Sequence, residues 1–148
     1  MKLLIVDDDP TTRALLAEAL EMHGACVMSS ASVLEAQRTL AAWHPDMMIS
    51  DVGMPRHTGY DLIRNVRGLP AAQGGSTPAI ACTACAGARD RVRAIDAGFD
   101  AVVSKPVDLD VLVETIGHVA AVREPGSAAP AGDGSGAPGS PRRSAPDS

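Results

Sequence analysis

Acidic, hydroxyl and amino side chains occur at four separate places in the chain, each next to a short run of aliphatic residues. Asp7–Asp9 follow the first run, and Asp51, Thr83 and Lys105 follow three later runs. Clustered carboxylates repel one another unless a cation lies among them, and their oxygens suit Mg²⁺. A carboxylate can also act as a nucleophile and form an aspartyl phosphate. These residue types predict a site for a divalent cation and a phosphoryl group.

The elements that must position these residues are strands alternating with helices. Strands are expected at Leu3–Val6, Cys26–Met28, Met47–Ser50, Ala79–Cys82 and Ala101–Ser104. Several of these runs do not alternate in polarity, as expected for strands covered on both faces. Right-handed crossovers between such strands give an α/β fold with a doubly wound, five-stranded parallel sheet and helices on both faces. Ligands of such sheets bind at the carboxyl ends of the strands, where the polar residues lie.

Apolar spacing also predicts which sides of the helices face the core. Asp9 and Pro10 open the first helix, and its expected inner face consists of Leu15, Leu16, Ala19, Leu20 and Met22. In the fourth helix, before Gly98, the expected inner residues are Val92 and Ile95.

Length and composition are those of one globular domain followed by a tail. The chain has 148 residues, of which 45% are apolar, and only 2% are aromatic. Residues 1–122 are expected to form the domain. The segment 123–148 is rich in Gly, Pro, Ser and Ala, and we expect it to be disordered.

The charge and the cysteines exclude several classes of protein. A net charge of −5 argues against a nucleic-acid partner, which would require a basic surface. The absence of a long apolar run argues against a membrane span or a signal peptide. The three cysteines are an odd number and do not form a disulfide framework. The sequence therefore indicates a soluble, cytoplasmic protein without nucleic-acid or membrane partners.

The polar residues and their neighbours closely resemble the receiver domain of two-component response regulators. The resemblance covers residues 1–122 and rests on motifs that occur in the family's order: Leu4–Asp9, Ser50–Pro55 with Gly59, Thr83-Ala84 and Lys105-Pro106. Two further stretches, Thr77–Ala81 and Ala97–Asp100, look most like receivers attached to hybrid sensor kinases.

The resemblance implies a flavodoxin-like strand order, 2-1-3-4-5, and a role for each polar residue. It implies that Asp51 is the phosphoacceptor. Thr83 would then donate a hydrogen bond to the phosphoryl group and Lys105 would pair with it. The Lys105-Pro106 bond is typically cis in this family, and the cis isomer of an X-Pro bond costs only about 0.5–1 kcal/mol.

The same resemblance implies an Mg²⁺ site. Asp8 would be the main carboxylate ligand and Asp7 would order metal-bound water. Asp51 and the backbone carbonyl of Gly53 would complete the protein's contribution.

The function implied is that of a phosphorylation-dependent signalling switch, which catalyses only its own phosphorylation and dephosphorylation. A histidine kinase or a histidine phosphotransfer protein would donate the phosphoryl group, and an unidentified downstream protein would respond to it. No output domain is expected in this chain.

Three alternatives stay open. The stretch Asp7–Thr11 also fits the D-x-D-x-T motif of haloacid-dehalogenase-like phosphatases, in which the first aspartate is the nucleophile. Cys82 and Cys85 have the C-x-x-C spacing of redox and zinc sites. A structural interaction domain that is never phosphorylated is the third alternative.

Overall fold

The computed structural model describes residues 1–53, 58–84 and 87–123. Met54, Pro55 and Cys85, which belong to sequence motifs, lie outside the described residues, as do residues 124–148 of the expected tail. The chain divides into two compact units, Met1–Ile116 and Gly117–Ser148, and the sheet belongs to the first. No helix in the described ranges is both long and apolar enough to cross a membrane.

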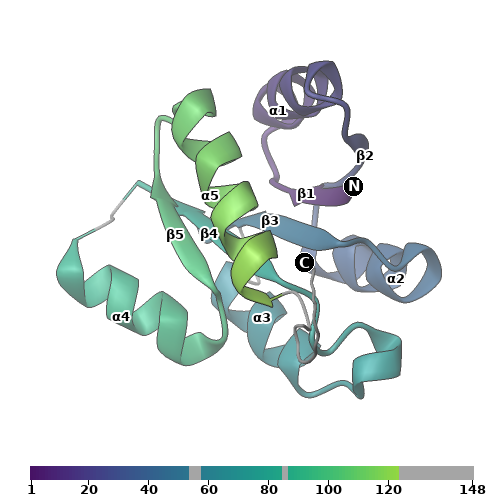
Figure 1. Cartoon of the computed structure of the whole chain (residues 1–148). Helices are drawn as coiled ribbons and strands as arrows, with labels where there is room; N and C mark the ends of the chain where they lie inside the picture. Colours follow the sequence, from purple (N-terminus) through teal and green to yellow (C-terminus); the bar gives the residue numbers. More distant parts are fainter. Residues whose placement is uncertain (54–57, 85–86, 124–148) are drawn as a thin grey trace, which may run out of the picture. The chain divides into compact units, whose positions relative to one another are not determined.

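Strands and helices alternate along the described chain (Figure 1). The strands are β1 (Lys2–Val6), β2 (Cys26–Ser30), β3 (Met47–Asp51), β4 (Ala79–Thr83) and β5 (Ala101–Ser104). The helices are α1 (Pro10–Met22), α2 (Val33–Trp43), α3 (Gly59–Arg67), α4 (Ala88–Ala97) and α5 (Leu109–Arg123), with a short 3₁₀ turn, η1, at Ala71–Gln73.

All strand pairs are parallel, and their order is β2-β1-β3-β4-β5. The predicted doubly wound, flavodoxin-like fold is therefore confirmed. β2 was expected to end at Met28 but continues to Ser30, because Ser29 and Ser30 pair with Ile5 and Val6 of β1. Backbone pairing extended this strand beyond its apolar run.

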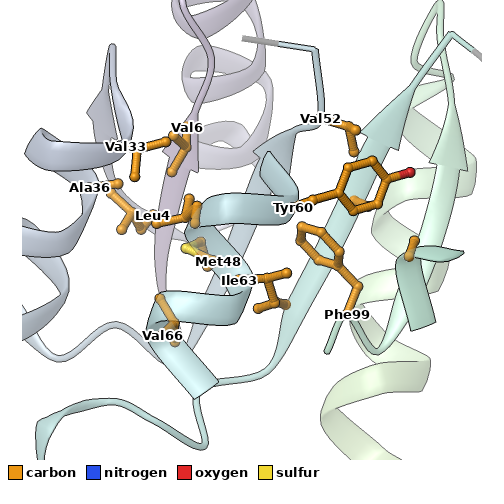
Figure 2. Packing of buried hydrophobic residues seen from close by; sticks show 14 of the residues in the cluster. Leu4, Val6, Val33, Ala36, Met48, Val52, Tyr60, Ile63, Val66 and Phe99 are labelled. Carbon is orange, nitrogen blue, oxygen red and sulfur yellow. The ribbon is translucent and has the colours of Figure 1, made fainter. Parts of the chain in front are cut away.

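The core on one face of the sheet joins alternate strand residues to α2, α3 and α4. Leu4 and Met48 pack there with helix residues such as Ile63. Figure 2 shows this packing, with the rings of Tyr60 and Phe99 beside one another. The intervening strand residues, such as Leu3, face the other way. Leu3 lines a cavity of about 200 Å³ together with residues of α1 and α5 (Leu20, Val113 and Ile116).

The expected inner face of α1 was too wide. Leu20 is buried, whereas Leu15 is 62% exposed and Met22 is 82% exposed. At about 100° per residue, Leu15 lies about 140° and Met22 about 160° around the helix from Leu20. Both therefore lie on the side away from the buried position.

The expected inner residues of α4 were also wrong. Val92 and Ile95 are 60% and 48% exposed, and Ala94 is the buried residue. α4 contacts the edge strand β5 and helix α3 (Figure 1). An edge strand offers little surface to cover, so one small side chain makes the close contact and the larger residues stay outside.

Candidate functional site

The junction of β1 and α1 separates the three neighbouring aspartates by environment. Asp7 is 3% exposed, while Asp8 and Asp9 are exposed. Asp9 is the N-cap of α1, where its carboxylate accepts hydrogen bonds from the Thr11 N–H (3.2 Å) and the Thr12 hydroxyl (2.7 Å). The bond from Thr12, with that from Thr11, lowers the pKa of Asp9. The Asp9 carboxylate therefore caps α1, and the carboxylates of Asp7 and Asp8 are available to the site.

Asp51 is the last residue of β3 and is 9% exposed. Its Oδ1 accepts a hydrogen bond from the Gly53 N–H at 3.2 Å. The main chain beyond it is held by the Val52 N–H, which donates to the Cys82 carbonyl at 3.1 Å. Gly59 lies against this backbone, because a Cβ there would be 2.5 Å from the Asp51 carbonyl oxygen. The backbone at Asp51 and Val52 is thus held by β4 on one side and by close contact with Gly59 on the other.

Lys105 lies between two of these aspartates. Its Nζ is 3.0 Å from Asp51 Oδ1 and 3.4 Å from Asp7 Oδ2. The Lys105 N–H donates to the carbonyl of Thr83 at 2.8 Å, which connects the ends of β4 and β5. Thr83 is half-buried at the end of β4, opposite Ser104. The peptide bond between Lys105 and Pro106 is cis, as predicted.

These contacts shift the pKa values of the buried groups in the site. Burial raises the pKa of Asp7, although the Asp9 N–H and the charge of Lys105 partly counter it. Burial by itself lowers the pKa of Lys105, but the hydrogen bond and charge of Asp51, together with Asp7, outweigh it and raise the pKa. Lys105 is therefore a protonated ammonium at neutral pH, held between carboxylates.

The acidic side chains fit a small, hard cation. Asp7, Asp8 and Asp51 each offer a carboxylate oxygen, and these oxygens lie within 4.8 Å of one another. Three carboxylates and one ammonium leave negative charge uncompensated. Oxygen donors of this kind at this spacing suit Mg²⁺. Of the predicted site residues, the structure brings Asp7, Asp8, Asp51 and Lys105 together, and it places Thr83 and Gly53 on the adjoining main chain.

Sequence reasoning missed Arg13, which lies in the first turn of α1. Its Nη1 donates to the backbone carbonyl of Asp7 at 2.8 Å. The only signal in the sequence was a cationic residue one turn after the Asp9 cap, which is an ordinary feature of an exposed helix.

The C-x-x-C spacing does not produce a reactive thiol at Cys82. Cys82 is buried in β4 beside Asp51, and burial raises its pKa to about 12. It is therefore a protonated core residue. Its partner in the motif, Cys85, lies outside the described residues.

Known proteins of similar sequence and fold indicate the family to which the chain is related. The family model for the response regulator receiver domain matches residues 3–117. An uncharacterized 14.6 kDa protein of Leptolyngbya boryana is 45% identical over 108 residues, which are 73% of this chain and 81% of that protein. The sensor histidine kinase RcsC of Escherichia coli is 38% identical over 116 residues, which are 78% of this chain but only 12% of that protein.

A solved structure gives the same result. The signal receiver domain of a signal transduction histidine kinase from Syntrophus aciditrophicus is 34% identical, with a TM-score of 0.71, and the match covers 80% of this chain and 89% of that one.

Proposed function

The chain belongs to the response regulator receiver domain family, and we propose that it is a phosphorylation-dependent switch whose phosphoacceptor is Asp51. The observation that carries the proposal is the position of Asp51: its carboxylate contacts the Lys105 ammonium at 3.0 Å and lies in one cluster with Asp7 and Asp8. Position and charge compensation are the main requirements of phosphoryl transfer.

In the proposed reaction an Asp51 carboxylate oxygen attacks the phosphorus of a phosphohistidine. An O–P bond forms as the N–P bond breaks, and the bonding electrons leave with the imidazole nitrogen. Lys105 compensates the charge of the transferred group, and the Thr83 hydroxyl donates to one of its oxygens. Asp7, Asp8, Asp51 and the Gly53 carbonyl would hold Mg²⁺. The bound ion would supply neutralisation of the phosphoryl oxygens.

The proposed donor is a histidine kinase or a histidine phosphotransfer protein. The relationship to RcsC, a sensor histidine kinase, supports this class of partner. Phosphorylation replaces the Asp51 carboxylate with a larger, more negative group beside Lys105 and Thr83. We propose that this change biases the main chain around them and so changes the affinity for a downstream protein.

The experiment that tests the proposal is incubation with Mg²⁺ and acetyl phosphate, followed by borohydride trapping and mass mapping of the modified residue. We expect one phosphoryl group on Asp51 in the wild type and none in Asp51→Asn. Asp96→Asn, an exposed change on α4, is the matched control and should be modified like the wild type.

Other outcomes would contradict the proposal. Modification of Asp7 would favour a haloacid-dehalogenase-like phosphatase. No modification of any residue, with phosphohistidine donors also inactive, would favour an interaction domain that is not phosphorylated.

A further inference from the structure

The contact between Arg13 and Asp7 joins a cationic side chain to the backbone of the acidic cluster. Arg13 Nη1 is 2.8 Å from the Asp7 carbonyl oxygen. Within the described ranges, Arg13 forms no ion pair with a carboxylate, so it is not bound to the side chains of the cluster. The guanidinium holds the main chain and not an acid.

The acceptor of this hydrogen bond is a buried carbonyl at the end of β1. The paired residues of β1 end with Val6, which is opposite Ser30 on one side and Ser50 on the other. Asp7 is the next residue and is 3% exposed. A buried carbonyl beyond the end of a ladder needs another donor, and Arg13 supplies it.

The peptide unit that Arg13 holds is the one that carries Asp8. The Asp7 carbonyl and the Asp8 N–H belong to the same planar group. Asp7 is also fixed through its side chain, which accepts from the Asp9 N–H at 2.9 Å and contacts Lys105 at 3.4 Å. By contrast, no hydrogen bond or ion pair with any described residue holds the exposed Asp8 carboxylate. The position of Asp8 therefore depends on its backbone.

We infer that Arg13 is a positioning residue, which orients the peptide unit between Asp7 and Asp8 so that the Asp8 carboxylate is aimed into the cation site. This inference rests on the proposed function, because it assigns Arg13 a role toward the Mg²⁺ of that site.

Two explanations of the Arg13 contact predict opposite changes in Mg²⁺ affinity when Arg13 is removed. If Arg13 acted only through its charge, removing it would relieve repulsion of a cation and Mg²⁺ would bind more tightly. If Arg13 positions Asp8, removing it leaves the ligand misdirected and Mg²⁺ binds more weakly. Loss of a group that orients a metal ligand commonly costs about 10-fold or more in affinity.

The measurement is the Mg²⁺ dissociation constant of the whole chain, determined by calorimetry for the wild type, Arg13→Met and Arg13→Lys. We expect Arg13→Met to bind about 10-fold more weakly. Arg13→Lys keeps the charge but has a shorter reach and no planar fork, so it should also bind more weakly than the wild type. Arg64→Met removes the same charge from an exposed position of α3 and should leave the constant unchanged.

A second measurement reports on geometry in the absence of metal. The amide proton of Asp8 belongs to the peptide unit that Arg13 holds, so its chemical shift should move in Arg13→Met and Arg13→Lys but not in Arg64→Met. Unfolding curves identify variants that fail to fold. If Arg13→Met is one of them, the comparison rests on Arg13→Lys.

The outcomes separate this inference from the proposed function. Equal or tighter Mg²⁺ binding by the folded Arg13 variants would overturn the inference, while phosphorylation of wild-type Asp51 would leave the proposed function intact. A wild type that neither binds Mg²⁺ nor accepts a phosphoryl group would overturn both.

Discussion

Asp7, Asp8 and Asp51 have the same chemical group in three environments, and the differences between them determine what each residue does. Asp7 is buried against Lys105, Asp8 is exposed beside it, and Asp51 lies at the end of a buried strand. Burial of a carboxylate disfavours its charged form. The site therefore concentrates negative charge at a cost to the stability of the metal-free fold.

Asp7→Asn should stabilise the metal-free protein at neutral pH. The folded pKa of Asp7 is raised above its ordinary value, so the folded protein holds this proton more tightly than the unfolded chain. The contribution to stability is full below the ordinary pKa and is lost as the pH rises through the folded pKa. Asparagine keeps an acceptor for the Asp9 N–H without the buried charge.

We expect Asp7→Asn to gain about 1 kcal/mol in the free energy of unfolding near pH 7 and almost nothing near pH 3. Denaturant unfolding in the presence of a chelator, at both pH values, measures this gain in the free energy of unfolding. Asp96→Asn, which removes an exposed carboxylate, is the control. A gain of the same size at both pH values would show that the charge of Asp7 is not the cause.

Cys82 and Cys26 provide a test of burial at the scale of one residue. With a pKa of about 12, Cys82 should resist alkylation by iodoacetamide in the native protein at about pH 8. The exposed Cys26 should react under the same conditions. Mass mapping before and after denaturation measures both, and rapid native labelling of Cys82 would restore the redox interpretation of its motif.

At the scale of elements, the start of α3 packs closely against the end of β3 at Gly59. A Cβ at Gly59 would lie 2.5 Å from the Asp51 carbonyl oxygen and 2.9 Å from Val52 Cα. Both neighbours are backbone atoms, so they cannot rotate away. The helix start itself is a capping box between Thr58 and Asp61, which fixes where Gly59 must lie.

Gly59→Ala should therefore destabilise the fold by about 2 kcal/mol and weaken Mg²⁺ binding, because the backbone of Asp51 and Val52 must shift to admit the added Cβ. Gly117→Ala is the matched control: it is a helical glycine of α5 with no atom within 4 Å of an added Cβ. It should gain about 0.5–1 kcal/mol. Unfolding curves measure the stability of both variants, and calorimetry measures their Mg²⁺ affinity. Unchanged Mg²⁺ binding in Gly59→Ala would show that the close packing at Gly59 does not affect the site.

At the scale of the first unit, the two ends of the strands have different roles. The candidate site lies at the carboxyl ends of the strands. At the amino ends of β4 and β5, Arg67 donates to the carbonyls of Gly98 (2.9 Å), Gly75 (3.0 Å) and Thr77 (2.7 Å) and contacts Asp100 at 3.2 Å. The Asp100 carboxylate also accepts from the Ala79 N–H at 2.8 Å. One side chain thus joins α3 to the loops that precede β4 and β5.

Arg67→Met should lower the free energy of unfolding by about 2 kcal/mol, because several partly buried acceptors lose a charged donor at once. Phosphorylation of Asp51 in the folded fraction should continue, because Arg67 lies at the amino ends of the strands and the site lies at their carboxyl ends. Arg64→Met, one turn earlier and exposed, should stay within about 0.5 kcal/mol of the wild type. A loss of phosphorylation without a loss of stability would contradict this division of tasks.

The sequence by itself determined the order of the elements, the parallel sheet and the edge at which the polar residues lie. Aliphatic runs and the Asp9 and Ser32 helix caps are local signals, and right-handed crossovers convert their order into a topology. The motifs that carried the family resemblance are local signals too, and each of them lies at the end of a strand.

Only the tertiary structure decided which aspartate is buried, that Lys105 lies 3.0 Å from Asp51, and that Arg13 holds the backbone beside Asp8. It also decided that Val92 and Met22 face solvent. Burial and contact depend on neighbours that are distant in the chain. The apolar spacing along one helix carries no information about those neighbours. A pattern shows which side a helix can bury, while the size of the surface opposite decides how much of that side is covered.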